Sequence, residues 1–188
     1  MTRIELGAGL GCLRTWVPGD ASSIARHANN RSIWLNLRDA FPHPYSIDDA
    51  ACYITTSLKD HPPTGLAIAV GEEAVGSIGV MLHPDVERVS AELGYWLAEP
   101  FWGRGITTAA VRAMTGYAFA TFPLTRVYAV PFASNCASTR VLEKAGYRLE
   151  GHMQRAAIKN GHVVDQLLYA VTDEEWRRQA APGKMRLA

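Results

Sequence analysis

Apolar side chains recur with a period of two in the middle of the chain, which predicts β-strands there. Residues 65–70 and 74–82 are largely apolar, and the Gly-Glu-Glu at 71–73 predicts a hairpin turn between them. In residues 89–97 apolar positions alternate with polar or small ones, and Glu92 is on the polar side. These segments predict a run of antiparallel strands at the centre of the fold.

Apolar positions spaced by three and four residues predict helices on either side of this run. The spacing is clearest in residues 106–117 and recurs in 135–145, where Gly146 occupies the position that favours a positive φ. Ser46 and Asp49 match the capping-box pattern, which predicts a helix from there to about residue 58.

The N-terminal part predicts shorter elements. Residues 12–17 suit a strand, and residues 21–28 suit a helix capped by Asp20. Two prolines exclude a helix interior at residues 41–45, which we expect to form a loop.

The C-terminal part predicts three strands, at residues 126–130, 147–150 and 162–171, with a turn at 160–161. A charged short helix follows from residue 173. The whole order predicts an α+β (mixed α/β) domain with a mixed central sheet.

Length and composition narrow the class of protein. The chain has 188 residues, which predicts a single domain over residues 1–188. It is 48% apolar and 20% charged, and no apolar run reaches the roughly 18 residues of a membrane span. Residues 1–11 lack the features of a secretory signal, so a cytoplasmic location is expected. A net charge of +1 with no long run of one sign argues against a nucleic-acid groove.

The cysteines do not indicate a redox or metal function. Cys12, Cys52 and Cys136 are odd in number and widely spaced, which fits neither a disulfide framework nor a zinc site. We therefore expect reduced thiols and no metal.

Gly103 and Gly105 lie at a predicted strand-to-helix junction, where a tight turn would bring a ligand onto the free amides of the helix. The other interpretation is a turn into a packed helix with no ligand. A Walker loop is excluded because the Gly-Lys-Ser/Thr is missing. A dinucleotide fingerprint is excluded because Thr108 stands in place of its third glycine.

Three segments decide between these interpretations when they are taken together. They are Glu-Leu-Gly-Tyr-Trp-Leu at 92–97, Pro-Phe-Trp-Gly-Arg-Gly-Ile-Thr-Thr-Ala-Ala at 100–110, and the stretch 135–151 that begins with Asn135 and includes Arg-Val-Leu-Glu-Lys-Ala-Gly-Tyr. Jointly they closely resemble the GCN5-related N-acetyltransferase (GNAT) superfamily, and within it the RimJ/RimL branch of ribosomal-protein N-terminal acetyltransferases and their relatives. The resemblance covers nearly the whole chain.

The resemblance implies a GNAT fold, in which a mixed, mostly antiparallel sheet splays open between the strand ending near Leu97 and the strand at 126–130. Acetyl-CoA would bind in that opening as co-substrate. The residues that the resemblance places against it are Tyr95, Trp96 and Leu97 through their backbone, Gly103, Arg104, Gly105 and Ile106 at the pyrophosphate, Thr107 and Thr108 in the first helical turn, Asn135 on the pantetheine arm, Ser138 near the sulfur, and Arg140 toward the nucleotide.

The implied reaction is direct transfer of the acetyl group to a primary amine in a ternary complex. Deprotonating a lysine-like amine at pH 7 costs about 4–5 kcal/mol, whereas an α-amine costs about 1.4 kcal/mol. Glu92 matches the strand position of the family's usual base and could accept that proton. The other interpretation of Glu92 is a solvated carboxylate on an outward strand face.

One position departs from the family pattern. Leu142 stands where many members of the superfamily have a tyrosine that protonates the leaving thiolate. A thiol with a pKa near 8.5 leaves fairly well unaided, and Ser138 is the nearest remaining donor. Helix capping is the other role open to Ser138. A covalent route through Cys136 is disfavoured because no histidine is near it in sequence and the family reacts by direct transfer.

The family's acceptor wall corresponds to the N-terminal helix and loop, which hold the substrate-binding candidates Trp34, Arg38, His43 and Tyr45. Acids and bases are mixed in this region, so a peptide or protein N-terminal α-amine is expected rather than a polyamine, an aminoglycoside or another small amine. The alternative function is an acyl-CoA-binding regulatory or interaction protein without turnover. We expect a monomer or a homodimer with no nucleic-acid or membrane partner.

Overall fold

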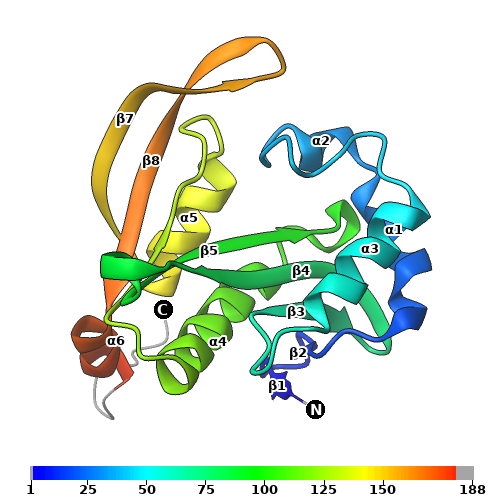
Figure 1. Ribbon diagram of the computed structural model, residues 1–188, viewed down its shortest axis with the longest axis horizontal. Helices are drawn as coiled ribbons and strands as arrows, with labels where there is room; N and C mark the ends of the chain where they lie inside the picture. Colours follow the sequence, from blue (N-terminus) through cyan, green and yellow to red (C-terminus); the bar gives the residue numbers. More distant parts are fainter. Residues whose placement is uncertain (1, 181–188) are drawn as a thin grey trace.

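Eight strands form one sheet with helices on both of its faces in the computed structural model, which describes residues 2–180 (Figure 1). The strands are β1 (Arg3–Glu5), β2 (Cys12–Arg14), β3 (Gly65–Val70), β4 (Glu73–Leu82), β5 (Ser90–Leu97), β6 (Arg126–Ala129), β7 (Arg148–Lys159) and β8 (His162–Thr172). The helices are α1 (Ala21–Ala28), α2 (Arg31–Trp34), α3 (Ile47–Ser57), α4 (Ile106–Thr121), α5 (Cys136–Ala145) and α6 (Asp173–Ala180), with 3-10 turns η1 (Pro18–Asp20), η2 (Asp85–Glu87) and η3 (Glu99–Phe101).

The sheet is mixed and mostly antiparallel, as predicted. Its strand order is β1-β2-β3-β4-β5-β6-β8-β7, and β5–β6 is the parallel pair. Those two strands are paired from Ser90↔Arg126 to Glu92↔Tyr128, and the rest of β5 continues without β6 beside it. The predicted opening of the sheet is therefore confirmed, and it starts next to Glu92.

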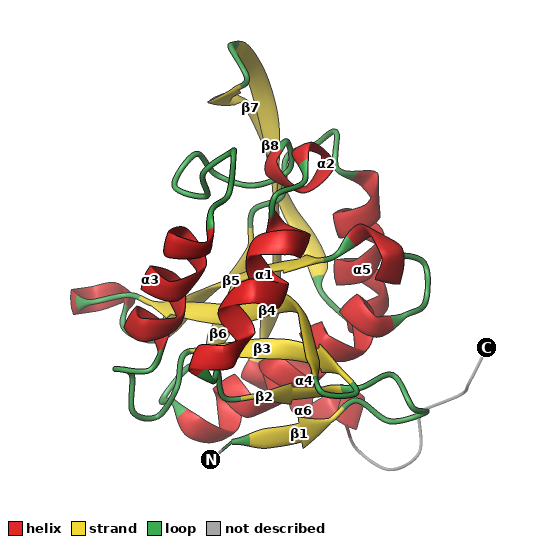
Figure 2. Cartoon of the chain, turned by 90° about the vertical axis from the view of Figure 1, so that its right-hand side faces the viewer, coloured by secondary structure: helices red, strands yellow, loops and turns green. Residues whose placement is uncertain are grey.

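Two hydrophobic cores lie on opposite faces of the sheet. Figure 2 shows the helices that cover these faces. Strand β3 contributes to both, because successive side chains point to opposite faces. Leu66 and Ile68 belong to the larger core with α4 and α5, whereas Ala67 belongs to the smaller core under α1 and α3. On β5 the same alternation directs Leu93 into the larger core and leaves Glu92 on the other face.

The predicted helix ends at Ser46 and Gly146 are confirmed. Ser46 Oγ accepts a 3.1 Å hydrogen bond from the Asp49 amide, and the Asp49 carboxylate accepts one of 2.8 Å from the Ser46 amide. Gly146 ends α5 with φ +97°. Both ends depend on a few neighbouring residues, so they could be recognised in the sequence.

The predicted capping role of Asp20 is wrong. Its side chain makes no cap bond to α1 and instead forms a two-pronged ion pair with Arg14, with N–O distances of 2.7 and 2.8 Å. Both groups are buried, and a buried guanidinium requires a charged, hydrogen-bonded partner. The carboxylate therefore stabilises the contact between β2 and η1.

Other boundaries also differ from the prediction. The strand expected at 147–150 continues to Lys159, because β7 pairs with β8 along most of its length through two register shifts. Its outer part is largely exposed and lacks a clear apolar alternation, so the pattern of side chains did not predict a strand there. The hairpin projects from the body of the molecule (Figure 1).

Near the N-terminus, the predicted strand at 12–17 is only β2, and β1 precedes it. The short helix α2 was not expected; it begins where the Asn30 side chain accepts hydrogen bonds from two backbone amides. None of the helices within residues 2–180 has the length and apolar character of a membrane span.

Candidate active site

The unpaired end of β5 leads through η3 into the glycine turn before α4. After Glu92 the edge of β5 that faces β6 has no strand against it. The Leu97 carbonyl at the end of this edge already accepts a 2.7 Å hydrogen bond from the Trp102 indole. The backbone groups of β5 that could hydrogen-bond a linear ligand therefore lie mainly between Glu92 and Leu97.

The glycine turn presents the N-terminus of α4 to solvent. Gly103 and Gly105 have φ +75° and +82°, and no atom would lie within 4 Å of a Cβ at either position. Gly105 is the N-cap of α4 and provides no side-chain cap. The first-turn amides, including those of Thr107 and Thr108, therefore remain available for an anion such as a phosphate. Arg104 is exposed, with its guanidinium 5.4 Å from the centre of the Phe101 ring.

Ser138 lies across the opening from this turn and meets β5. Its amide donates to Asn135 Oδ1 at 3.1 Å, so Asn135 is the N-cap of α5 and Ser138 is not. The Ser138 hydroxyl is 2.8 Å from the Tyr95 hydroxyl. Because the cap uses the oxygen of the Asn135 amide, its NH₂ group is the part left for a ligand.

Tyr95 was expected to act only through its backbone, and its hydroxyl is the feature that sequence reasoning missed. Burial raises the pKa of Tyr95 to about 12, while the hydrogen bond with Ser138 opposes this shift. Leu142, at the position of the family's tyrosine, is fully buried in the larger core. A phenol is therefore present near Ser138, but it comes from β5 rather than from α5.

Glu92 lies on the other face of the sheet, at the start of the opening. Its side chain is 15% exposed and forms an ion pair with Arg38, with 2.5 Å between Oε1 and Nη2. Arg38 follows α2, so two of the predicted site residues, 54 positions apart in sequence, are brought into contact. A partly exposed carboxylate at the edge of the opening can accept a proton from a bound amine.

A second polar group lies beside Glu92. Tyr128 pairs with Glu92 in the β5–β6 register, and its hydroxyl is 2.7 Å from His83 Nε2. His83, Glu87, Ser90 and Tyr128 line a surface cavity of about 320 Å³. Burial is the main cause that raises the pKa of Tyr128, and the charge of Glu92 adds to it.

Not all of the residues predicted to form the acceptor wall are at the surface. Trp34 stacks with His43 at 5.7 Å between ring centres, so these two candidates do lie together. Tyr45, in contrast, is 7% exposed and packs in the smaller core, where burial raises its pKa to about 12. Its ring therefore lies in the core and not on the surface of the predicted wall.

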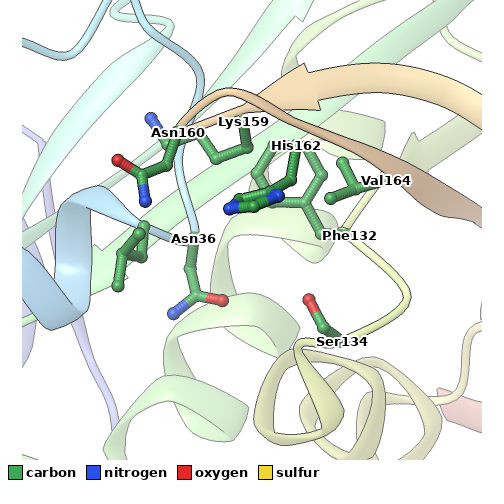
Figure 3. Close-up of a pocket in the computed structure, with 8 residues that line it drawn as sticks. Asn36, Phe132, Ser134, Lys159, Asn160, His162 and Val164 are labelled. Atoms are coloured by element: carbon green, nitrogen blue, oxygen red, sulfur yellow. The ribbon is translucent and has the colours of Figure 1, made fainter.

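A cavity of about 330 Å³ lies between α2 and the β7–β8 hairpin (Figure 3). None of its lining residues was predicted from the sequence to be a site residue, and Asn160 was expected only in a turn. They come from three separate segments: Leu35 and Asn36; Phe132 and Ser134; and Lys159, Asn160, His162 and Val164. No local sequence pattern could have joined these segments. Arg140 is exposed on α5 and forms no part of this cavity.

Comparison with known proteins agrees with this architecture. A family model described as an acetyltransferase (GNAT) domain matches residues 12–148. The chain is 38% identical over 99 residues to YdaF of Bacillus subtilis, a proposed ribosomal N-acetyltransferase, covering 52% of this chain and 54% of YdaF. It is 33% identical over 95 residues to the ribosomal-protein-serine acetyltransferase of Escherichia coli, covering 50% and 53%. The chain thus spans about half the length of these curated relatives.

A solved structure extends the similarity over most of the chain. Mycobacterium smegmatis RimJ, in complex with CoA-disulfide, superposes with a TM-score of 0.78 at 25% sequence identity. The superposition covers 92% of this chain and 90% of RimJ.

Proposed function

Because this chain belongs to the GNAT acetyltransferase family, we propose that it is an N-acetyltransferase that transfers an acetyl group from acetyl-CoA to the α-amine of a peptide or protein N-terminus. One observation carries the proposal. After Glu92 the edge of β5 is not paired with β6, and the chain then passes through η3 to the N-terminus of α4, which has no side-chain cap. A candidate base and a candidate phosphate site therefore mark the two ends of one opening.

The cofactor half of the proposal rests on the residues around α4 and α5. The amides of the turn from Gly103 to Ile106 would bind the pyrophosphate, with Thr107, Thr108 and Arg104 beside it. The free part of the β5 edge and the NH₂ group of Asn135 would hydrogen-bond the pantetheine arm. When bound, acetyl-CoA supplies the thioester that the amine attacks.

Glu92 is the proposed base. The reaction forms an amide C–N bond and breaks the thioester C–S bond, so the amine must lose a proton and the departing sulfur must gain one. Glu92 would take the amine's proton directly or through water. Arg38 holds this carboxylate at the edge of the opening until an ammonium takes its place.

Ser138 is the proposed hydrogen-bond donor to the departing sulfur, and Tyr95 is a positioning residue. A serine hydroxyl has one proton, which it cannot give to the sulfur and to another acceptor at once. Tyr95, with its pKa raised to about 12, keeps its own proton and can donate it to Ser138 Oγ at 2.8 Å. The serine proton is then left for the sulfur, which offsets the absence of a tyrosine at position 142.

The choice of an α-amine rests on two points. At pH 7 the free-energy cost of deprotonating an α-amine is about 3 kcal/mol lower than that of deprotonating a lysine. Two relatives carry names that refer to ribosomal N-acetyltransferase or ribosomal-protein-serine acetyltransferase activity.

Calorimetry with acetyl-CoA, followed by a thiol-release assay over an amine panel, tests the proposal. We expect binding, and faster thiol release with short peptides that have free N-termini than with spermidine. Clear preference for spermidine would overturn the acceptor while leaving the acetyltransferase activity standing. Tight binding without thiol release on any amine would instead favour the acyl-CoA-binding protein, which Leu142 alone supports.

A further inference from the structure

The cavity of about 330 Å³ between α2 and the β7–β8 hairpin is lined by Asn36, two residues before Arg38, and by Ser134. Ser134 in its wall immediately precedes Asn135, the N-cap of α5. The loop that carries Ser134 is fixed to β8 by hydrogen bonds from Ala133 to Asp165 and from Leu167 to Pro131, each 2.9 Å. The wall that carries Ser134 is therefore held in place by β8, and the cavity's volume is at the small end of the range for ligand pockets.

Lys159 is one of the residues that line this cavity. Its side chain is 4% exposed, and its Nζ is 2.7 Å from Asp39 Oδ1 and 3.8 Å from the centre of the Trp34 ring. The partner carboxylate is 71% exposed, so solvent weakens its hold on the ammonium. A buried ammonium next to a cavity favours a ligand of negative charge.

The other polar groups of the wall can all donate hydrogen bonds. Asn36, Ser134, Asn160 and His162 are arranged around a common space in Figure 3. A carboxylate is the side-chain group that accepts several hydrogen bonds and donates none. None of the residues lining the cavity is an aspartate or a glutamate, so a cationic side chain would find no charged partner there.

We propose that this cavity binds a carboxylate side chain of the acceptor, and that the enzyme prefers peptides with an acidic residue next to the α-amine. The inference rests on the proposed function and names its substrate class. The amine enters the opening near Glu92, while the acidic side chain lies among the hydrogen-bond donors at the tip of the β7–β8 hairpin.

The test compares C-terminally amidated peptides Ser-Asp-Ala-Ala, Ser-Asn-Ala-Ala and Ser-Lys-Ala-Ala, in which the aspartate provides the sole carboxylate. We expect kcat/KM for the Asp peptide to exceed that for the Asn peptide by about tenfold, with the Lys peptide lowest. The same order is expected in the Kd of each peptide for the protein saturated with free CoA.

Two substitutions should move the Asp/Asn preference in opposite directions. Lys159→Met removes the cation and should bring the ratio close to one, whereas Asp39→Asn removes the competing carboxylate and should raise it. Val163→Ala, on the same hairpin but outside the cavity, should leave it at the wild-type value. Melting temperatures check that each variant is folded.

Equal kcat/KM for the three peptides would overturn the inference and leave peptide acetylation standing. An unchanged ratio in both Lys159→Met and Asp39→Asn would do the same. If no peptide is acetylated, the order of Kd values still decides: an Asp preference supports the cavity's role, and its absence removes it.

Discussion

The cofactor side of the opening is made from two short stretches of chain, whereas the acceptor side is assembled from segments far apart in sequence. On the cofactor side, Tyr95 to Thr108 form one continuous strand–turn–helix unit, and Asn135 and Ser138 are one helical turn apart. On the acceptor side, Asp39 and Lys159 are in contact across 120 residues. The first side presents mostly backbone, and the second presents side chains.

This difference predicts how substitutions on each side will affect binding and activity. Backbone amides at a helix N-terminus bind phosphate whatever the neighbouring side chains are, provided that the turn can adopt its conformation. A wall of converging side chains changes its chemistry with one substitution. We therefore expect substitutions on the cofactor side to abolish activity on every amine, and those on the acceptor side to change which amine is used.

The largest expected effect is on the cofactor side. Gly105→Val places a β-branched residue at φ +82°, which forces the turn out of its conformation. Losing two charge-assisted hydrogen bonds of about 2 kcal/mol each should raise the Kd for acetyl-CoA about 1000-fold, measured by calorimetry. Gly71→Val is the matched control, since Gly71 also has a positive φ (+61°) and open space around its Cβ position, but lies in the β3–β4 turn. Wild-type affinity in Gly105→Val would show that the phosphate site is elsewhere.

The next largest effect concerns the base. Glu92→Gln should lower kcat/KM about 100-fold and flatten the acidic limb of its pH profile, with little change in the Kd for acetyl-CoA. The substitution also breaks the ion pair with Arg38, so Arg38→Gln is the control that removes the pair and keeps the carboxylate. If the two variants lose activity equally and keep the wild-type pH profile, the pair is structural and Glu92 is not the base.

A smaller effect is expected at the sulfur. Ser138→Ala should lower kcat about tenfold, the value of one hydrogen bond to a partly charged group. Tyr95→Phe removes only the group that orients Ser138, so its effect should be smaller and should vanish in the Ser138→Ala background. Rates for both single variants and the double variant test this. Additive losses would mean that the Tyr95 hydroxyl acts independently of the Ser138 hydroxyl.

The smallest expected effect is on the titration of two buried tyrosines, one from each side of the opening. Burial raises the pKa of Tyr95 and of Tyr45 to about 12. Because the folded state holds these protons more tightly than the unfolded chain, they stabilise the fold below pH 10, and this contribution is lost as the pH rises through about 12. Tyrosinate absorbance should show it: Tyr95→Phe should reduce the amplitude of the high-pH phase.

Much of the fold followed from local patterns. The hairpin of β3 and β4, the alternation along β5, the capping box at Ser46 and the end of α5 at Gly146 each depend on residues a few positions apart. The outer half of β7 did not follow, because pairing with β8 makes it a strand and its own side chains are mostly exposed. The carboxylate of Asp20 was misjudged for a similar reason, since its partner Arg14 lies on another element.

The sequence by itself determined the helix N-terminus that we propose binds the cofactor, because φ preferences and helix ends are set by neighbouring residues. It also indicated Glu92 and Ser138 through a resemblance that spans continuous motifs. Only the tertiary structure decided that Arg38 meets Glu92, that Tyr95 meets Ser138 and that Lys159 lines the cavity between α2 and the β7–β8 hairpin. Such contacts arise when the sheet brings together segments that are far apart in sequence. A local sequence pattern does not show which of these segments will meet.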